Sequence, residues 1–234
     1  MASKRRKARE IALKVLYQFD LVGNSPDKTF DQVVSEELFR PIIESFVSEI
    51  SPGKAKADYG DTPEGYSLAD LVEDVLVWRA DSNLESLLNE AALKACPDEE
   101  IAKSLSVKIL GKIESNKPLE TFARELVVQT SANLAKIDEI LVRFADNWSL
   151  DRMASLDRSI LRFAVCELLN FKEIPINVTI NEAIELAKKY STERSREFIN
   201  GILDKVQREF KPDKNDPRDK AVPGKNIAEM EPLP

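Results

Sequence analysis

Apolar residues recur at intervals of three and four along most of this chain, which is the spacing of one face of an α-helix. The pattern is clearest over 175–210, where two stripes follow each other: Ala183, Leu186, Ala187 and Tyr190, then Phe198, Ile199, Ile202, Leu203 and Val206. No long stretch shows the alternation of apolar and polar residues that is typical of a half-buried strand. The sequence therefore predicts an all-α protein.

The ends of these two helices are marked by residues that cap helices. Thr179 and Glu182 have the T-x-x-E spacing of a capping box, which predicts that a helix starts at Thr179. Ser191 or Thr192 offers the N-cap of the next helix. Because a glycine inside a helix costs about 1 kcal/mol relative to alanine, we expect Gly201 to mark a close contact with another helix.

The same spacing predicts helices elsewhere in the chain. They cover the N-terminal residues up to about 22, then 29–50 with a division at Pro41, 68–78, 84–95, 101–113, 119–144 as one helix or two, and 156–170. The run 51–67 holds three glycines and two prolines and is predicted to be a loop. The polar, proline-bearing tail 211–234 is predicted to be disordered.

Charge is distributed unevenly along the chain, whose formal net charge is −7. Residues 27–120 hold 20 acidic and 10 basic residues, whereas the remainder holds 24 basic and 21 acidic residues. The acidity therefore belongs to the middle segment, and the net charge of the whole chain does not argue against nucleic-acid binding.

Several kinds of chemistry are excluded or unsupported by the residue types present. The chain has no histidine, which excludes Ser-His-Asp and Cys-His catalysis and histidine-based metal sites. Cys96 and Cys166 lie far apart and indicate neither a disulfide framework nor a zinc site. No glycine-rich phosphate loop is present. We predict a non-enzymatic binding protein without metal or cofactor, and the absence of an 18-residue apolar run or signal peptide predicts a cytoplasmic location and no membrane span.

A cluster of cations opens the chain. Five of them, Lys4, Arg5, Arg6, Lys7 and Arg9, lie within six positions at the start of a predicted helix. Cations are unfavourable at a helix N-terminus, because they oppose the helix dipole. A solubilising run of charge is one interpretation, and a phosphate-binding patch is the other.

Three segments together resemble the NusB family of transcription antitermination factors: RRKAREIALKVLYQFDL at 5–21, IDEILVRFADNWSLDRMASLDRSILRFAVCELL at 137–169, and IPINVTINEAIELAKKYSTERSREFINGILDKV at 174–206. The resemblance implies a pair of packed helical bundles. It assigns 1–26 to a basic N-terminal helix and 118–210 to a C-terminal bundle. Residues 27–117 are longer than the corresponding part of typical members and are interpreted as an acidic helical insert.

The resemblance also implies a function, partners and a site. Members bind boxA-type single-stranded RNA of nascent ribosomal RNA together with the ribosomal protein NusE, and the complex joins RNA polymerase; a homodimer is one of the states left open. The implied RNA-binding residues are Arg5, Arg6, Lys7, Arg9, Tyr17, Arg194, Arg196 and Phe198, of which Tyr17 and Phe198 either stack on bases or belong to the core. Asp157, on the expected exposed side of its helix, and Arg158 are the implied partner contacts.

Two alternatives stay open at this point. In the first, the chain is a helical protein-interaction module whose acidic insert binds the partner. In the second, it is an accessory domain related to those of ribosomal RNA cytosine methyltransferases. The glycine motif of a methyltransferase domain is not present in the sequence.

Overall fold

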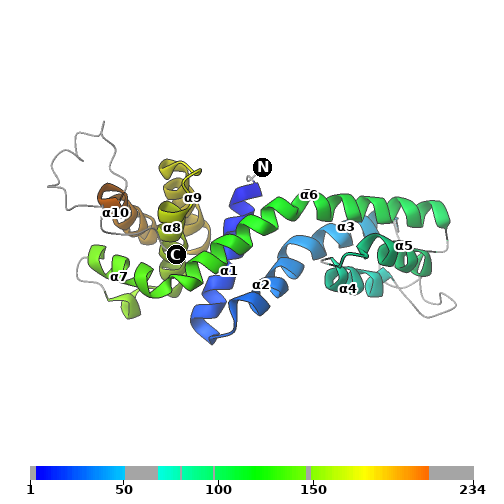
Figure 1. Cartoon of the computed structure of the whole chain (residues 1–234), viewed down its shortest axis with the longest axis horizontal. Helices are drawn as coiled ribbons and strands as arrows, with labels where there is room; N and C mark the ends of the chain where they lie inside the picture. Colours follow the sequence, from blue (N-terminus) through cyan, green and yellow to red (C-terminus); the bar gives the residue numbers. More distant parts are fainter. Residues whose placement is uncertain (1–3, 51–67, 80, 97, 146–148, 211–234) are drawn as a thin grey trace. The chain divides into compact units, whose positions relative to one another are not determined.

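The described residues of the computed structural model, 4–50, 68–79, 81–96, 98–145 and 149–210, form helices and their connections, with no β-strand among them (Figure 1). The elements are α1 (Lys4–Val22), α2 (Pro26–Val34), η1 (Ser35–Phe39), α3 (Arg40–Ile50), α4 (Leu68–Trp78), α5 (Leu84–Ala95), α6 (Glu99–Ala132), α7 (Leu134–Phe144), η2 (Leu150–Arg152), α8 (Ser155–Asn170), α9 (Ile176–Tyr190) and α10 (Glu193–Phe210). The predicted all-α class is confirmed. The predictions for 51–67 and 211–234 fall outside the described residues.

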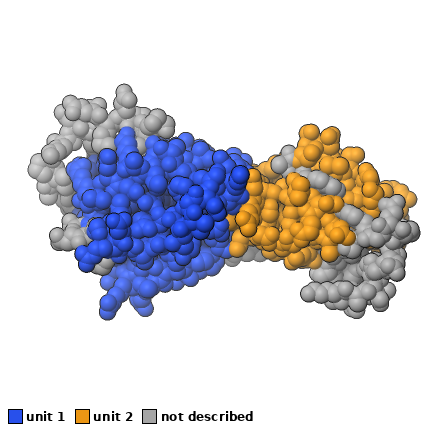
Figure 2. Space-filling model, turned by 90° about the horizontal axis from the view of Figure 1, so that it is seen from below, with its two compact units in different colours: residues 1–30, 121–234 blue, residues 31–120 orange. Residues whose placement is uncertain are grey.

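The chain divides into two compact units, which Figure 2 shows in different colours. Unit 1 comprises residues 1–30 and 121–234, and unit 2 comprises residues 31–120. Unit 2 is therefore one continuous stretch of sequence, whereas unit 1 is assembled from both ends of the chain.

Helix α8 is the centre of unit 1. It packs against α1, α7, α9 and α10 (Figure 1). Its apolar side chains are buried on several sides: Ile160, Leu161, Phe163, Ala164, Val165, Cys166 and Leu168. A helix that is buried nearly all round occupies the middle of a bundle rather than its surface. Burial also raises the pKa of the Cys166 thiol to about 12, so this cysteine is a core residue and not a reactive group.

Unit 2 has a core of its own, formed by α3, α4, α5, η1 and the first part of α6. Its fully buried side chains include Phe39, Ile43, Leu71, Val75, Leu88, Leu105 and Ile109. Helix α4 packs against both α3 and α5. The predicted helices 68–78 and 84–95 are confirmed as α4 and α5.

Pro41 and Pro118 both lie within helical segments that continue past them. Before Pro41 the chain widens into the π-helical turn η1, in which the Arg40 N–H bonds the Ser35 carbonyl five residues back. Proline lacks an N–H and crowds the carbonyl four residues earlier, and the wider turn accommodates this locally. The helices predicted separately over 101–113 and from 119 onward are one helix, since α6 runs from Glu99 to Ala132 and passes through Pro118 without interruption. Pro118 is solvent-exposed, so water can bond the carbonyl that it leaves unpaired.

The predicted capping box at Thr179 is also wrong. Helix α9 begins three residues earlier, at Ile176. Thr179 is buried and its hydroxyl donates to Glu167 Oε1 at 2.5 Å. Glu182 accepts hydrogen bonds from Arg6 instead of capping the helix. The N-cap expected for the following helix is confirmed as Thr192, whose Oγ1 accepts a hydrogen bond from the Ser195 N–H.

Gly201 does not mark a close helix contact. It is solvent-exposed on α10, and a Cβ added to it would meet no atom within 4 Å. Gly23, in contrast, ends α1 with a φ of +72°, where an L side chain is strained.

Separately, no helix among the described residues is both long enough and apolar enough to cross a membrane.

The two glycines therefore predict opposite effects of the same substitution. Gly201→Ala should stabilise the protein by about 0.5–1 kcal/mol, because alanine is the better helix former and nothing obstructs its methyl group. Gly23→Ala should destabilise it by about 1–2 kcal/mol, because its backbone is left-handed. Chemical denaturation followed by circular dichroism measures both. A destabilised Gly201→Ala variant would contradict the open surroundings of this residue.

Candidate nucleic-acid interface

The first turn of α1 presents Arg5 above an aromatic surface. The Arg5 side chain is exposed, and its guanidinium carbon lies 5.5 Å from the centroid of the Phe122 ring. Phe122 is itself held edge-on by Phe171, with ring centroids 5.6 Å apart. A guanidinium over a ring face is attracted by the ring quadrupole and keeps its N–H groups available at the edge. Arg5 is exposed, and among the described residues none accepts a hydrogen bond from it.

Arg6 is held by a carboxylate of α9. Its Nε and Nη2 donate to the two carboxylate oxygens of Glu182, each at 2.8 Å. The Arg6 side chain is 33% exposed and that of Glu182 is 13% exposed. This hydrogen bond raises the pKa of Arg6 above its ordinary value. The neighbouring Lys7 side chain is half-buried.

A second ion pair joins the same two helices, one turn further along α1 and about two turns further along α9. Lys189, in the last turn of α9, donates to Glu10 Oε1 of α1 at 2.8 Å. The hydrogen bond raises the pKa of Lys189. Each helix thus supplies one cation and one anion, and the two pairs fix the position of α1 relative to α9.

Arg9 belongs to the core and not to the exposed cations with which the sequence grouped it. It is fully buried, with 0% exposure, and it donates from Nε and Nη2 to the two oxygens of Glu167 at 2.7 and 2.6 Å. Its guanidinium also lies 5.3 Å from the centroid of the Phe122 ring. Its place could have been read from spacing, since positions 9, 12, 13 and 16 share one helix face and the last three are buried.

The first turn of α10, directly after the connection 191–192, carries the other predicted cations, and the segment 191–196 is called the α9–α10 turn below. Arg194 is exposed, and Arg196 is half-buried with its Nη1 3.8 Å from Glu193 Oε1. Glu185 of α9 pairs with Lys188. The pKa of Glu185 is lowered by its hydrogen bond with Lys188 and, to a smaller extent, by the charges of Arg6 and Arg196.

Asp157 is not on the exposed side of its helix, contrary to the prediction. It is only 7% exposed and accepts hydrogen bonds from the Ser191 hydroxyl at 2.6 Å and the Ser195 hydroxyl at 2.8 Å. Because Asp157 lies in the first turn of α8, the positive end of the helix dipole also stabilises its carboxylate. Asp157 therefore fixes the turn that bears Arg194 and Arg196.

Arg158, the other predicted partner contact, is engaged within the chain. It donates from Nε to Asp20 Oδ2 at 3.1 Å, and Arg162 donates from Nη1 to Asp20 Oδ1 at 2.6 Å. Arg162 also bonds both oxygens of Asp138 at 2.8 Å. Burial raises the pKa of Asp20, but the hydrogen bonds from the two arginines outweigh it, and the pKa ends below its ordinary value. This network ties α1 and α7 to α8.

Tyr17 and Phe198 are both half-buried, so part of each ring reaches solvent. Their roles as stacking platforms stay predictions. The residues that sequence reasoning missed are the partners of the cations: Phe122, Glu10, Glu182, Glu185 and Lys189. No local pattern identifies them, because Arg6 and Glu182 are 176 residues apart in sequence.

A family model described as the NusB family matches residues 77–208 of this chain. The chain is 47% identical over 96 residues to the transcription antitermination protein NusB of Thermodesulfovibrio yellowstonii. It is 48% identical over 95 residues to that of Natranaerobius thermophilus. The matched region is 41% of this chain in both cases and spans 64% of the first relative, less than two thirds of its length, and 68% of the second.

Two solved structures align with most of this chain. NusB of T. maritima aligns with 28% identity over 89% of this chain and 94% of its own, with a TM-score of 0.47. A chain in a crystal structure of a plectonemic RNA supercoil aligns with 21% identity over 88% of this chain and 94% of its own, with a TM-score of 0.52. The second similarity concerns the fold alone.

The buried Arg9–Glu167 pair predicts a large loss of stability when one partner is neutralised. Glu167→Gln should lower the free energy of unfolding by about 3–5 kcal/mol, because it leaves the Arg9 charge buried without a counterion. Glu139→Gln, an exposed carboxylate on α7, is the matched control and should change it by less than about 0.5 kcal/mol. Denaturant titration measures both.

The double variant Arg9→Met/Glu167→Met separates charge from packing. It should recover most of the stability lost in Glu167→Gln, because two apolar side chains of similar length leave no uncompensated charge. The Thr179 hydroxyl can then bond a carbonyl of its own helix. A double variant as unstable as Glu167→Gln would show that the ion pair is not the reason for the loss.

Proposed function

The chain belongs to the NusB family, and on this premise we propose that it is a non-catalytic transcription antitermination factor that binds single-stranded RNA. The observation that carries the proposal is the cationic surface of α1 and the α9–α10 turn. Its members are Arg5, Arg6, Lys7, Arg194 and Arg196, and this set is called the cation surface below. Arg9 is left out, because Glu167 already occupies its guanidinium inside the core.

The cation surface has the chemistry that RNA backbone requires. Arginine binds phosphate through a planar pair of N–H donors, and exposed arginines supply the long-range attraction that draws RNA to a protein. Arg5 is exposed and supported from below by Phe122. Arg194 is exposed at the start of α10, near the positive end of that helix. Both can therefore contact phosphate without disturbing the fold.

The half-buried rings of Tyr17 and Phe198 extend the proposal from the backbone to the bases. A ring that is partly open to solvent can stack on an unpaired base, which is how single-stranded RNA is commonly held. We propose boxA-type RNA of nascent ribosomal transcripts as the ligand. The support for this choice is family membership, together with the antitermination role in the names of the relatives.

We further propose that the chain binds RNA together with NusE and joins RNA polymerase. Asp157 and Arg158 lie at the first turn of α8, where we propose the NusE contact. Because both side chains are engaged within the chain, their contribution is to hold the surface in shape. Asp157 fixes the α9–α10 turn, and Arg158 fixes the end of α1 through Asp20.

The RNA-binding proposal predicts a salt-dependent affinity that depends on the cation surface. The variant Arg5→Gln/Arg194→Gln should bind a labelled single-stranded boxA RNA more weakly than the unchanged protein. The slope of log K against log salt concentration should fall by about 0.7 for each phosphate that the variant no longer binds. Fluorescence anisotropy across a salt series measures both quantities.

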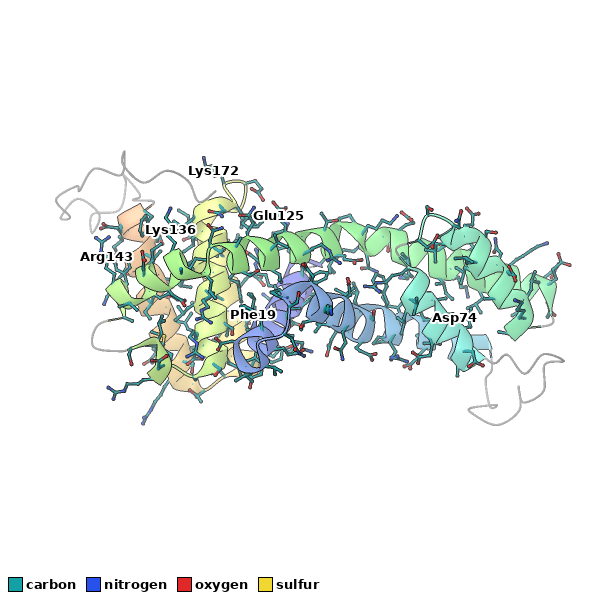
Figure 3. All side chains as sticks on the ribbon, turned by 60° about the horizontal axis from the view of Figure 1, so that its bottom comes forward. Phe19, Asp74, Glu125, Lys136, Arg143 and Lys172 are labelled. Atoms are coloured by element: carbon teal, nitrogen blue, oxygen red, sulfur yellow. The ribbon has the colours of Figure 1, made fainter. Side chains whose placement is uncertain are left out.

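The control for this experiment is Lys136→Gln, which removes a cation from α7 (labelled in Figure 3). It should leave the affinity and the slope nearly unchanged. An RNA of the same composition in scrambled order tests base preference and should bind more weakly. Equal losses in the control and in the double variant would reject the cation surface as the RNA site.

Joint binding of RNA and NusE predicts positive coupling between the two ligands. A saturating amount of purified NusE should tighten RNA binding, and RNA should tighten NusE binding by the same factor, because coupling free energy is reciprocal. Titration of each ligand in the presence and absence of the other measures the factor. Independent binding of the two ligands would argue against a shared complex.

A further inference from the structure

The cations of the proposed RNA surface differ in how the chain itself uses them. Arg5 is exposed and lies over the Phe122 ring, whereas Arg6 donates from Nε and Nη2 to the two oxygens of Glu182. These two donors form the side-on edge of the guanidinium, one of its two edges that can bind an oxyanion through two parallel hydrogen bonds. The chain therefore fills this edge of Arg6 with its own carboxylate.

Carboxylate and phosphate are alternative ligands for one guanidinium edge. Both present two oxygens in a plane, and both form two parallel charge-assisted hydrogen bonds with arginine. One edge cannot hold both ligands at once, and a carboxylate beside the guanidinium also repels an approaching phosphate. An RNA phosphate must therefore displace Glu182 before Arg6 can bind it in this way.

The surroundings of Glu182 keep its carboxylate in place. Its side chain is only 13% exposed, so it does not turn freely into solvent when RNA approaches. The neighbouring Glu10–Lys189 pair holds α1 and α9 together on the same side and keeps Arg6 within reach. The ion pair is thus positioned by the fold rather than formed by two mobile surface side chains.

We propose that Glu182 competes with RNA phosphate for Arg6 and thereby lowers the RNA affinity of the cation surface. The inference rests on the proposed RNA-binding function and adds a regulatory residue to it. RNA that touches only the exposed arginines derives no affinity from Arg6. RNA held firmly at its other phosphates can displace Glu182 and bind Arg6 as well, so the competition favours well-positioned RNA over loosely attached RNA.

The test is the substitution Glu182→Gln in the full chain, with the labelled boxA RNA as the probe. The neutral amide no longer holds the Arg6 charge, so Arg6 becomes available to phosphate. RNA binding should tighten by about two- to fivefold, the range that corresponds to a partly exposed ion pair. The salt slope should become steeper by about 0.7, as for one additional bound phosphate on a single strand.

Glu185→Gln is the matched control, because it removes the same charge from the same helix three positions away. Glu185 pairs with Lys188 and influences Arg6 only through space, so its removal should have a smaller effect. The unchanged protein, Glu182→Gln, Arg6→Gln and the double variant Arg6→Gln/Glu182→Gln together form a double-mutant cycle. In the Arg6→Gln background, Glu182→Gln should no longer tighten RNA binding.

The outcomes separate this inference from the function on which it rests. If the unchanged protein binds RNA through Arg5 and Arg194 but Glu182→Gln binds no better, the competition does not exist and the proposed function stands. The inference would be overturned if Glu182→Gln raised the RNA affinity equally with and without Arg6, or if Glu185→Gln raised it as much. Either result would show that the effect comes from the loss of one negative charge and not from Arg6. Failure of the unchanged protein to bind RNA would reject both. Thermal unfolding of each variant confirms that a folded protein is compared.

Discussion

The structure of unit 1 depends on one constraint: its central helix, α8, is buried on nearly every side and yet carries charged side chains. A buried charge is costly unless it is paired and hydrogen-bonded. Glu167 is paired with Arg9 and bonded by Thr179, and Arg162 is paired with Asp20 and Asp138. Each partner comes from a helix that surrounds α8. The pairs therefore specify which helix lies on which side, in addition to the apolar contacts that hold the bundle together.

Because of this pairing, the basic residues at the N-terminal end of α1 differ in burial. Arg5 and Arg9 are one helical turn apart and both lie over the Phe122 ring, but Arg5 is exposed while Arg9 is buried. Arg6 is intermediate, since it is partly exposed and bound to Glu182. Three cations that look equivalent in sequence thus have different roles: Arg9 is part of the core, Arg5 is exposed, and Arg6 is held by an ion pair. The number of positive charges alone would overestimate how many can meet RNA.

Sequence reasoning succeeded where the information was local and failed where a distant residue decided the outcome. The apolar stripes identified α4, α5, α8 and α10 because helix periodicity is a property of neighbouring residues. Thr179 was misread as a cap because its actual partner, Glu167, is on another helix. Asp157 was expected at the surface for the same reason, since its two serine partners belong to the turn after α9. The helices expected separately over 101–113 and from 119 onward are joined in α6, because the packing of apolar residues on both sides of Pro118 outweighs the cost of one exposed proline.

The discontinuity of unit 1 has a consequence for the order in which the chain is made. Arg9 and its partner Glu167 are separated by 158 residues, and Arg6 and Glu182 by 176. A ribosome releases α1 before residues 31–120, and releases both before any of these partners has been synthesised. During synthesis the basic segment 4–22 therefore has neither its carboxylate partners nor a bundle to cover its apolar stripe. Unit 1 can fold completely only after the last third of the chain has been made. Residues 31–120, which form unit 2, separate the two parts of unit 1 in sequence.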